Sequence, residues 1–107
     1  MQDAVVVLVT TPTAEAAAAI ARALVEEGLA ACGNVVPGIR SIYRWEGQVQ
    51  DGAEALLVLK TVRRLVPALK DRLPSLHPYL VPELIVLPVE DGLGPYLEWV
   101  SASLRPP

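Results

Sequence analysis

Residues 4–10 read Ala-Val-Val-Val-Leu-Val-Thr, and the fold can be worked out from this stretch outward. β-Branched residues dominate it, and seven residues are too few for a helix, so it predicts a buried strand. Thr11-Pro12 ends the strand, and Thr13 is placed to cap a helix. The apolar positions of that helix recur every three or four residues, and Gly28 follows at the left-handed position that commonly ends a helix; they are Ala17, Ile20, Ala21 and Leu24.

The next two strands are predicted to form a hairpin. Residues 29–45 favour a strand that is interrupted at Pro37-Gly38, and residues 53–61 belong to the strand that returns. Glu46-Gly47 and Asp51-Gly52 are competing turn signals. We predict the turn at Glu46-Gly47 and a bulge at Asp51-Gly52.

The second half of the chain repeats the order of helix and strand. An apolar stripe at Val66, Leu69, Leu73 and Leu76 predicts a helix, with Pro67 in its first turn and Pro74 near its end. Residues 83–89 predict the fourth strand, and residues 93–104 predict a short final helix. This order is that of an α+β, ferredoxin-like split βαβ fold: an antiparallel sheet of four strands with two helices on one face, plus an extra C-terminal helix. Residues 1–107 fit a single domain of this kind.

The face of the sheet opposite the two helices is predicted to be apolar too. Right-handed crossovers place both main helices on one face. Six aliphatic side chains nevertheless point to the other face: Val6, Leu8, Leu56, Val58, Ile85 and Leu87. They would expose roughly 600 Å², the largest patch that a soluble monomer usually tolerates. The final helix is too short to cover this patch, so the chain is expected to associate with itself.

Charge and composition exclude several classes of function. Nine basic and twelve acidic residues give a net charge of -3, which disfavours nucleic acid and anionic membranes as partners. No apolar run reaches the ~20 residues of a membrane span. A single cysteine and no visible secretory signal favour a cytoplasmic location. Ten prolines and a single asparagine favour a thermostable protein that melts above the ~45–65 °C typical of mesophiles, and GC-rich coding is the alternative explanation of the same composition.

Three polar side chains are candidates for chemistry, and each has a simpler interpretation. His77 precedes Pro78-Tyr79 and is either a ligand oriented by the Glu83 carboxylate or a helix-end residue that bonds terminal carbonyls. Lys60 is either a cleft ammonium or a solvated strand end. Cys32 is either reactive or a small core residue. The sequence contains no phosphate-binding loop, nucleophile elbow, CxxC or HExxH motif, so no familiar enzyme class is indicated.

The aromatic side chains favour packing or an interface over a stacking platform. Tyr43 and Trp45 alternate along one strand and therefore share a side, and Trp99 lies close to Tyr96 on the final helix. We therefore predict Tyr43, Trp45 and Trp99 to be interface residues.

Several motifs taken together resemble one known family. They are Thr11-Pro12, Leu29-Ala30-Ala31-Cys32, Pro37-Gly38 followed by Ser41-Ile42-Tyr43-Arg44-Trp45-Glu46-Gly47, Leu59-Lys60-Thr61, His77-Pro78-Tyr79 with Pro82-Glu83, and Tyr96-Leu97-Glu98-Trp99. Over nearly the whole chain they resemble the CutA family of divalent-cation tolerance proteins. The resemblance implies a ferredoxin-like fold, a homotrimer, a cytoplasmic location and an association with copper and other divalent metals.

The metal ligands that the resemblance implies are incomplete in this sequence. Family members with a proposed copper site use a first-strand cysteine and two adjacent histidines before Pro-Tyr, and these positions hold Val9, Leu76 and His77 here. The expected function is a non-enzymatic trimer of divalent-metal tolerance. It would hold Cu²⁺ or another divalent cation weakly near clefts between subunits, through His77 with Cys32, Glu83, water or other subunits.

Two other functions are compatible with this fold class. One is a small-molecule sensor like the PII-type signalling trimers, with a ligand in the clefts between subunits, where Lys60, Tyr79 and Glu83 would converge. The other is a small hydrolase of the acylphosphatase kind. That hydrolase would need an anion-binding loop with an arginine before a helix, and residues 11–13 offer none.

Overall fold

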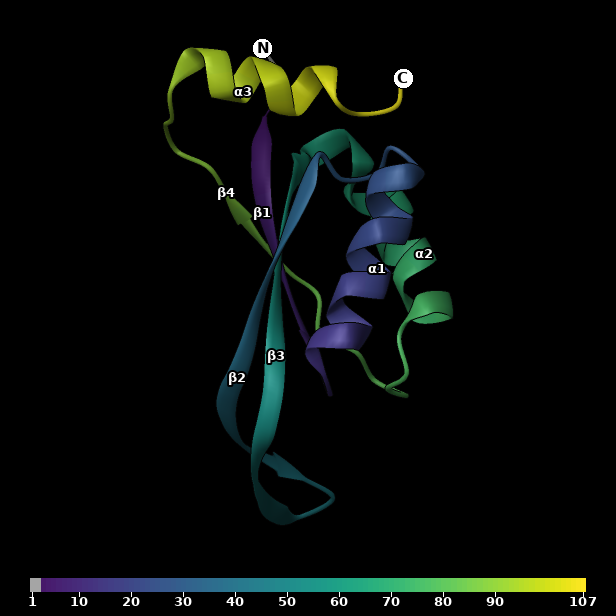
Figure 1. The fold of residues 1–107 in the computed structure, drawn as a ribbon, viewed down its shortest axis with the longest axis vertical. Coiled ribbons are helices and arrows are strands. Elements are labelled where there is room, and N and C mark those ends of the chain that lie inside the picture. Colours follow the sequence, from purple (N-terminus) through teal and green to yellow (C-terminus); the bar gives the residue numbers. More distant parts are fainter. Residues whose placement is uncertain (1–2) are drawn as a thin grey trace.

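The computed structural model describes residues 3–107 and places two helices on one face of a single sheet (Figure 1). The elements are β1 (Ala4–Thr11), α1 (Ala14–Glu26), β2 (Cys32–Trp45), β3 (Gln48–Val62), the single-turn 3-10 helix η1 (Arg63–Leu65), α2 (Val66–Leu76), β4 (Ile85–Pro88) and α3 (Gly94–Ala102). The strands are antiparallel neighbours in the order β2-β3-β1-β4. The predicted ferredoxin-like α+β fold with an extra C-terminal helix is confirmed.

The core lies between the sheet and the helices α1 and α2. Alternate residues of β1 and β3 are fully buried and meet the apolar stripes of the two helices: Val5, Val7, Val9, Leu57, Leu59, Ile20, Leu24, Leu69 and Leu73. The hydroxyl of Thr13 caps α1 by accepting the backbone N–H of Ala16 at 3.1 Å. Gly28 takes the left-handed conformation after the helix, at φ +71°. The predicted beginning and end of the first helix are therefore confirmed.

The β2–β3 hairpin turns at Glu46-Gly47, as predicted. Glu46 and Gly47 have φ values of 50° and 77°, the two positive angles of a type I′ turn. The predicted bulge at Asp51-Gly52 is wrong, since Ile42 pairs with Asp51 and Ser41 with Gly52 in regular register.

The irregularity lies instead at Pro37-Gly38. Val36 pairs with Leu56 and Ile39 with Glu54, so two residues of β2 stand opposite one residue of β3. Proline has no N–H to donate to the ladder, and Gly38 has a φ of +68° that favours glycine.

Two strands are shorter than the sequence predicts. β2 begins at Cys32 rather than Leu29, because the N–H groups of Leu29 and Ala30 still donate to the Leu24 carbonyl at the end of α1. β4 spans four residues rather than 83–89, because this edge strand pairs only with residues 5–8 of β1.

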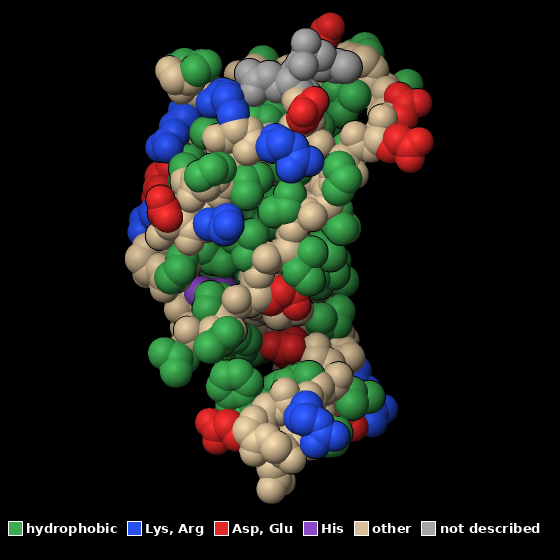
Figure 2. All heavy atoms as spheres, turned by 180° about the vertical axis from the view of Figure 1, so that it is seen from behind, with side chains coloured by type: hydrophobic (Ala, Val, Ile, Leu, Met, Phe, Trp, Pro, Cys, Tyr) green, Lys and Arg blue, Asp and Glu red, His purple; other side chains and the backbone are tan. Residues whose placement is uncertain are grey.

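We call the side of the sheet opposite α1 and α2 the open face. Cross-strand register places on it Val6, Leu8, Leu56 and Val58, all partly buried, with Val36, Ile85 and Leu87, which are exposed. Seen from behind, a band of hydrophobic side chains runs along the middle of the molecule, interrupted by acidic side chains in its lower half, with further charged groups at the ends and along one side (Figure 2). Helix α3 lies across one end of the sheet and leaves most of the open face uncovered (Figure 1). The predicted apolar second face is therefore present.

Candidate functional site

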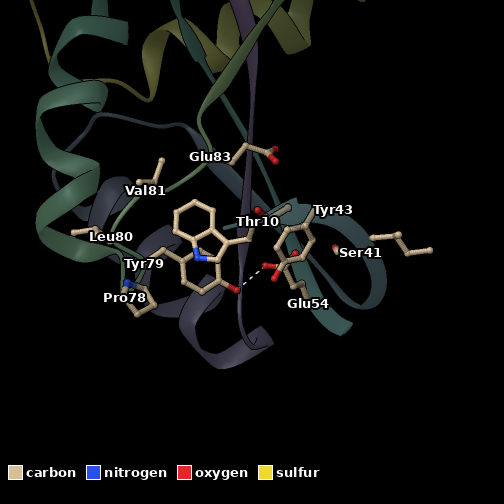
Figure 3. A pocket seen from close by; sticks show the side chains of 11 residues that line it. Thr10, Ser41, Tyr43, Glu54, Pro78, Tyr79, Leu80, Val81 and Glu83 are labelled. Carbon is tan, nitrogen blue, oxygen red and sulfur yellow. Dashed lines mark hydrogen bonds between the residues drawn. The ribbon is translucent and has the colours of Figure 1, made fainter. Parts of the chain in front are cut away.

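A groove of about 700 Å³ lies between the β2–β3 hairpin and the loop that connects α2 to β4 (Figure 3). We call it the hairpin groove. Side chains of β1, β2 and β3 line three sides of the groove, because alternation and register place them on the same face of the sheet. The connecting loop lines the remaining side. The polar and aromatic side chains of the lining are Thr10, Ser41, Tyr43, Trp45, Glu54, Tyr79 and Glu83.

One hydrogen bond joins the two sides of the hairpin groove. The Tyr79 hydroxyl donates to Glu54 Oε2 at 2.6 Å, from the loop to β3 (Figure 3). Burial raises the pKa of Tyr79 far above its usual value, and the hydrogen bond and the charge of Glu54 raise it further. The phenol therefore stays protonated and remains a donor to Glu54.

His77 anchors the same loop to β1. Its Nε2 lies 2.7 Å from the Thr10 carbonyl oxygen, and its Nδ1 accepts the backbone N–H of Tyr79 at 3.0 Å. Since a carbonyl requires a donor and an N–H requires an acceptor, the ring is neutral with its proton on Nε2. The buried ring is oriented by the Thr10 carbonyl and the Tyr79 N–H rather than by Glu83. His77 does end α2, as one interpretation predicted, but through its backbone N–H, which donates to the Leu73 carbonyl at 3.0 Å. Spacing along the chain could not reveal that Thr10 comes beside it.

Lys60 and Cys32 lie together at the other end of the open face. They are cross-strand partners in β3 and β2, and the Lys60 ammonium donates to Asn34 Oδ1. Cys32 Sγ lies 3.8 Å from the hydroxyl of Tyr96 on α3. Burial raises the pKa of Tyr96, and the contact with Cys32 adds to this. Within one chain, Tyr79 and Glu83 therefore share a groove, whereas Lys60 is not part of it.

The three aromatic residues predicted at an interface occupy two places. Tyr43 and Trp45 line the hairpin groove and are 47% and 46% exposed. Trp99 is 46% exposed on α3, where its ring packs against Tyr96 with centroids 5.6 Å apart. Helix α3 and the hairpin tip lie at opposite ends of the molecule (Figure 1).

The donor atoms of residues 3–107 do not form a closed metal site within one chain. Nowhere in residues 3–107 do three or more His, Cys, Asp or Glu side chains gather in a way that could hold a metal ion. Cys32 and His77 belong to separate surroundings, and both nitrogens of His77 are engaged in hydrogen bonds. A divalent cation bound by residues 3–107 would therefore need further ligands from water or from another copy of the chain.

Sequence reasoning missed Glu54 as a groove residue. The available signal was that it is a carboxylate in the otherwise apolar run Ala53–Leu59. The contact that ties Glu54 to the groove is the hydrogen bond from Tyr79, which is 25 residues away in the sequence.

Comparison with known proteins gives one consistent family. Residues 5–103 match the family described as CutA1 divalent ion tolerance protein. The divalent-cation tolerance protein CutA of Thermus thermophilus is 54% identical over 98 residues, covering 92% of this chain and 95% of that protein. The chloroplastic protein CutA of Arabidopsis thaliana is 48% identical over 101 residues, covering 94% of this chain but only 56% of its own length. The chain thus spans about half the length of several plant and animal relatives.

Solved structures agree with the sequence comparison. The Thermus thermophilus divalent cation tolerance protein superposes with a TM-score of 0.91 at 50% identity, covering 95% of this chain and 99% of that one. A structure named as the periplasmic divalent cation tolerance protein CutA from Archaeoglobus fulgidus has a TM-score of 0.91 at 31% identity, with coverages of 95% and 99%. The names of these relatives thus refer to more than one compartment. Among residues 3–107, no helix is long and apolar enough to cross a membrane.

Proposed function

The chain belongs to the CutA1 divalent ion tolerance family, and on that premise we propose that it acts in divalent-metal tolerance as a non-enzymatic homotrimer. The cytoplasm is the compartment in which we propose that it works, since its single cysteine suits a reducing environment.

The open face is the observation that carries the proposed assembly. Val36, Ile85 and Leu87 are 42%, 48% and 45% exposed, next to the partly buried aliphatic side chains of β1 and β3. Covering roughly 600 Å² of such surface stabilises an assembly by on the order of 10–15 kcal/mol, before the entropy cost of association. Resemblance to the CutA family favours three copies over two.

Light scattering behind size exclusion tests the trimer. At micromolar concentration we expect a mass of about three times the 11.5 kDa chain, because isolated copies would leave the open face in water. A single species at the chain mass would refute the proposal.

We further propose that divalent cations bind weakly, near clefts between subunits. His77 and Cys32 are the proposed ligands, with Glu83 from the hairpin groove. Coordination by His77 must replace one of its two hydrogen bonds, to the Thr10 carbonyl or to the Tyr79 N–H. Each such bond contributes about 1 kcal/mol net, so its loss lowers affinity several-fold. This cost supports weak binding rather than a tight resident ion.

Titration calorimetry with Cu²⁺ tests this proposal. We expect a dissociation constant of about 1 µM or weaker, because few protein ligands leave most of the coordination sphere to water. His77→Ala is expected to remove most of the heat of binding. The same titration of Cys32→Ser measures how much of the binding depends on Cys32 rather than on His77. Unchanged binding in His77→Ala would contradict the assignment, and picomolar affinity in the parent would require ligands that one chain does not assemble.

The hairpin groove favours a second candidate function, a small-molecule sensor of the PII-like kind. Tyr79 and Glu83 lie together in a concave site of about 700 Å³, within the usual range for small-molecule pockets. In a trimer, the Lys60 of another copy is available to complete such a site. Selective thermal stabilisation by a metabolite rather than by a metal would favour this candidate.

A further inference from the structure

The open face carries charges of opposite sign at its two ends. Glu54 and Glu83 line the hairpin groove at one end, and the groove lining within residues 3–107 contains no lysine, arginine or histidine. Lys60 pairs with Val6 and is the only basic residue among the strand positions of the open face. It lies six residues from Glu54 on β3, which is about 20 Å along an extended strand. Apolar surface therefore separates the ammonium from the acidic groove.

Both charges are incompletely paired within one chain. The Lys60 ammonium donates to Asn34 Oδ1, but it has three hydrogens to donate. Neither Lys60 nor Glu83 forms an ion pair within residues 3–107, although both side chains are partly buried. In Figure 3 the Glu83 carboxylate lies apart from the hydrogen bond between Tyr79 and Glu54. Each charge can therefore accept a further partner.

Covering the open face makes these unpaired charges costly, because a charge that leaves water without a partner opposes assembly. If two copies met with equivalent ends together, Lys60 would face Lys60 and the acidic grooves would face each other, and like charges repel. If the Lys60 end of one copy meets the hairpin groove of the next, both charges gain a partner as the apolar surface is buried. Such a head-to-tail contact is heterologous, and closed rings are built from contacts of this kind.

We propose that the hairpin groove is a docking site for a second copy of this chain, whose Lys60 forms an ion pair with Glu83. Glu83 is the acceptor rather than Glu54, because Tyr79 already occupies Oε2 of Glu54. The ion pair acts as a positioning contact that determines which ends of two copies meet. This inference rests on the proposed trimer and goes beyond it by naming the surfaces in contact.

Charge reversal tests the ion pair. Lys60→Glu and Glu83→Lys are each expected to raise the concentration at which half of the trimer dissociates by about tenfold or more, because each brings like charges together. The double variant Lys60→Glu/Glu83→Lys restores the pair with opposite polarity and is expected to recover most of this loss. Mass photometry over a dilution series measures dissociation, and circular dichroism verifies that each variant is folded.

Lys70 provides the matched control. It is the only other lysine in the sequence, and it is exposed on α2, which covers the opposite side of the sheet. Lys70→Glu is expected to leave dissociation unchanged. Lys70→Glu/Glu83→Lys has the same net charge as the reversed pair, but it should dissociate as readily as Glu83→Lys alone. Equal recovery in both double variants would assign the effect to net charge and overturn the inference.

Neutral variants test the same pair without a reversed charge, in case reversal prevents folding. Lys60→Met and Glu83→Gln each leave one charge without its partner, whereas the double variant removes both charges. The double variant is therefore expected to dissociate less readily than the product of the two single fold-changes predicts. Fold-changes that simply multiply would contradict a direct contact between the two side chains.

Trp45 locates the contact at the hairpin groove. It lines the groove, is 46% exposed in one chain, and becomes the single tryptophan in a Trp99→Phe background. We expect acrylamide to quench its fluorescence less in the trimer than in the dissociated chain, because the second copy covers the groove wall. Equal quenching in the two states would place the second copy elsewhere and refute the docking site.

Failure of this inference can be told apart from failure of the proposed trimer. A parent chain that is monomeric at micromolar concentration refutes the trimer and the docking site together. A trimeric parent that is weakened by none of the Lys60 and Glu83 variants refutes the docking site alone.

Discussion

Replacing Val36 with aspartate is expected to convert the proposed trimer into a monomer of the chain mass. Val36 lies on the open face, in register with Leu56, and is 42% exposed in one chain. Assembly through this face would bury three carboxylates without partners, at an effective cost of several kcal/mol for each. That cost is comparable to the whole gain from covering the face, so the equilibrium shifts by orders of magnitude. Light scattering behind size exclusion measures the change.

Val25→Asp is the matched control for this variant. Val25 is 40% exposed, nearly the same as Val36, but it lies on α1 rather than on the open face. The control is expected to remain trimeric, because its carboxylate stays in water. Circular dichroism verifies that both variants are folded. A folded Val36→Asp trimer would place the interface elsewhere on the molecule.

Gly33→Val is expected to lower the free energy of unfolding by about 2–3 kcal/mol. A Cβ at position 33 would lie 2.8 Å from the Cβ of Ala21 and 3.1 Å from a Leu59 methyl, closer than packed atoms allow. Helix α1 would therefore have to move away from β2. Denaturant unfolding at one fixed chain concentration measures the loss, since the proposed association would contribute to stability. We propose that the parent melts above the mesophilic range of ~45–65 °C, which leaves room to observe the difference.

Two further variants separate this steric cause from a general intolerance of glycine replacement. A Cβ at Gly52 meets no atom within 4 Å, so Gly52→Val should leave stability unchanged or raise it by up to about 1 kcal/mol through strand propensity. Combining Gly33→Ala with Ala21→Gly moves the methyl group from strand to helix. The pair should be less destabilised than the sum of its single substitutions. Strict additivity would show that the contact does not cause the loss.

The sequence by itself predicted the order of elements and the faces that they bury. Alternation along residues 4–10 and the helical stripe that ends before Gly28 depend on neighbours within a few residues, and both are present in the structure. The apolar second face was predictable for the same reason. Side chains of a strand alternate whatever the strand pairs with, so two apolar faces in sequence become two apolar faces in the sheet.

Strand ends and the bulge depended on less local causes. Asp51-Gly52 and Pro37-Gly38 both consist of residues that commonly interrupt a strand. Only Pro37-Gly38 shifts the register between β2 and β3. Arg40 binds Asp51 across the hairpin and suits regular pairing there, whereas Pro37 has no N–H to donate. Composition at one position cannot show what stands across from it.

The surroundings of the candidate site were decided by tertiary structure alone. His77 and Glu83 are six residues apart in sequence, yet His77 bonds the Thr10 carbonyl, 67 residues away. Glu54 accepts a hydrogen bond from Tyr79 across the groove. Lys60 lies outside the groove, where it donates to Asn34 and stands opposite Cys32 in the sheet. Residue types determined which chemistries were possible. Pairing between distant strands determined which side chains meet, because cross-strand contacts join positions that have no fixed spacing along the chain.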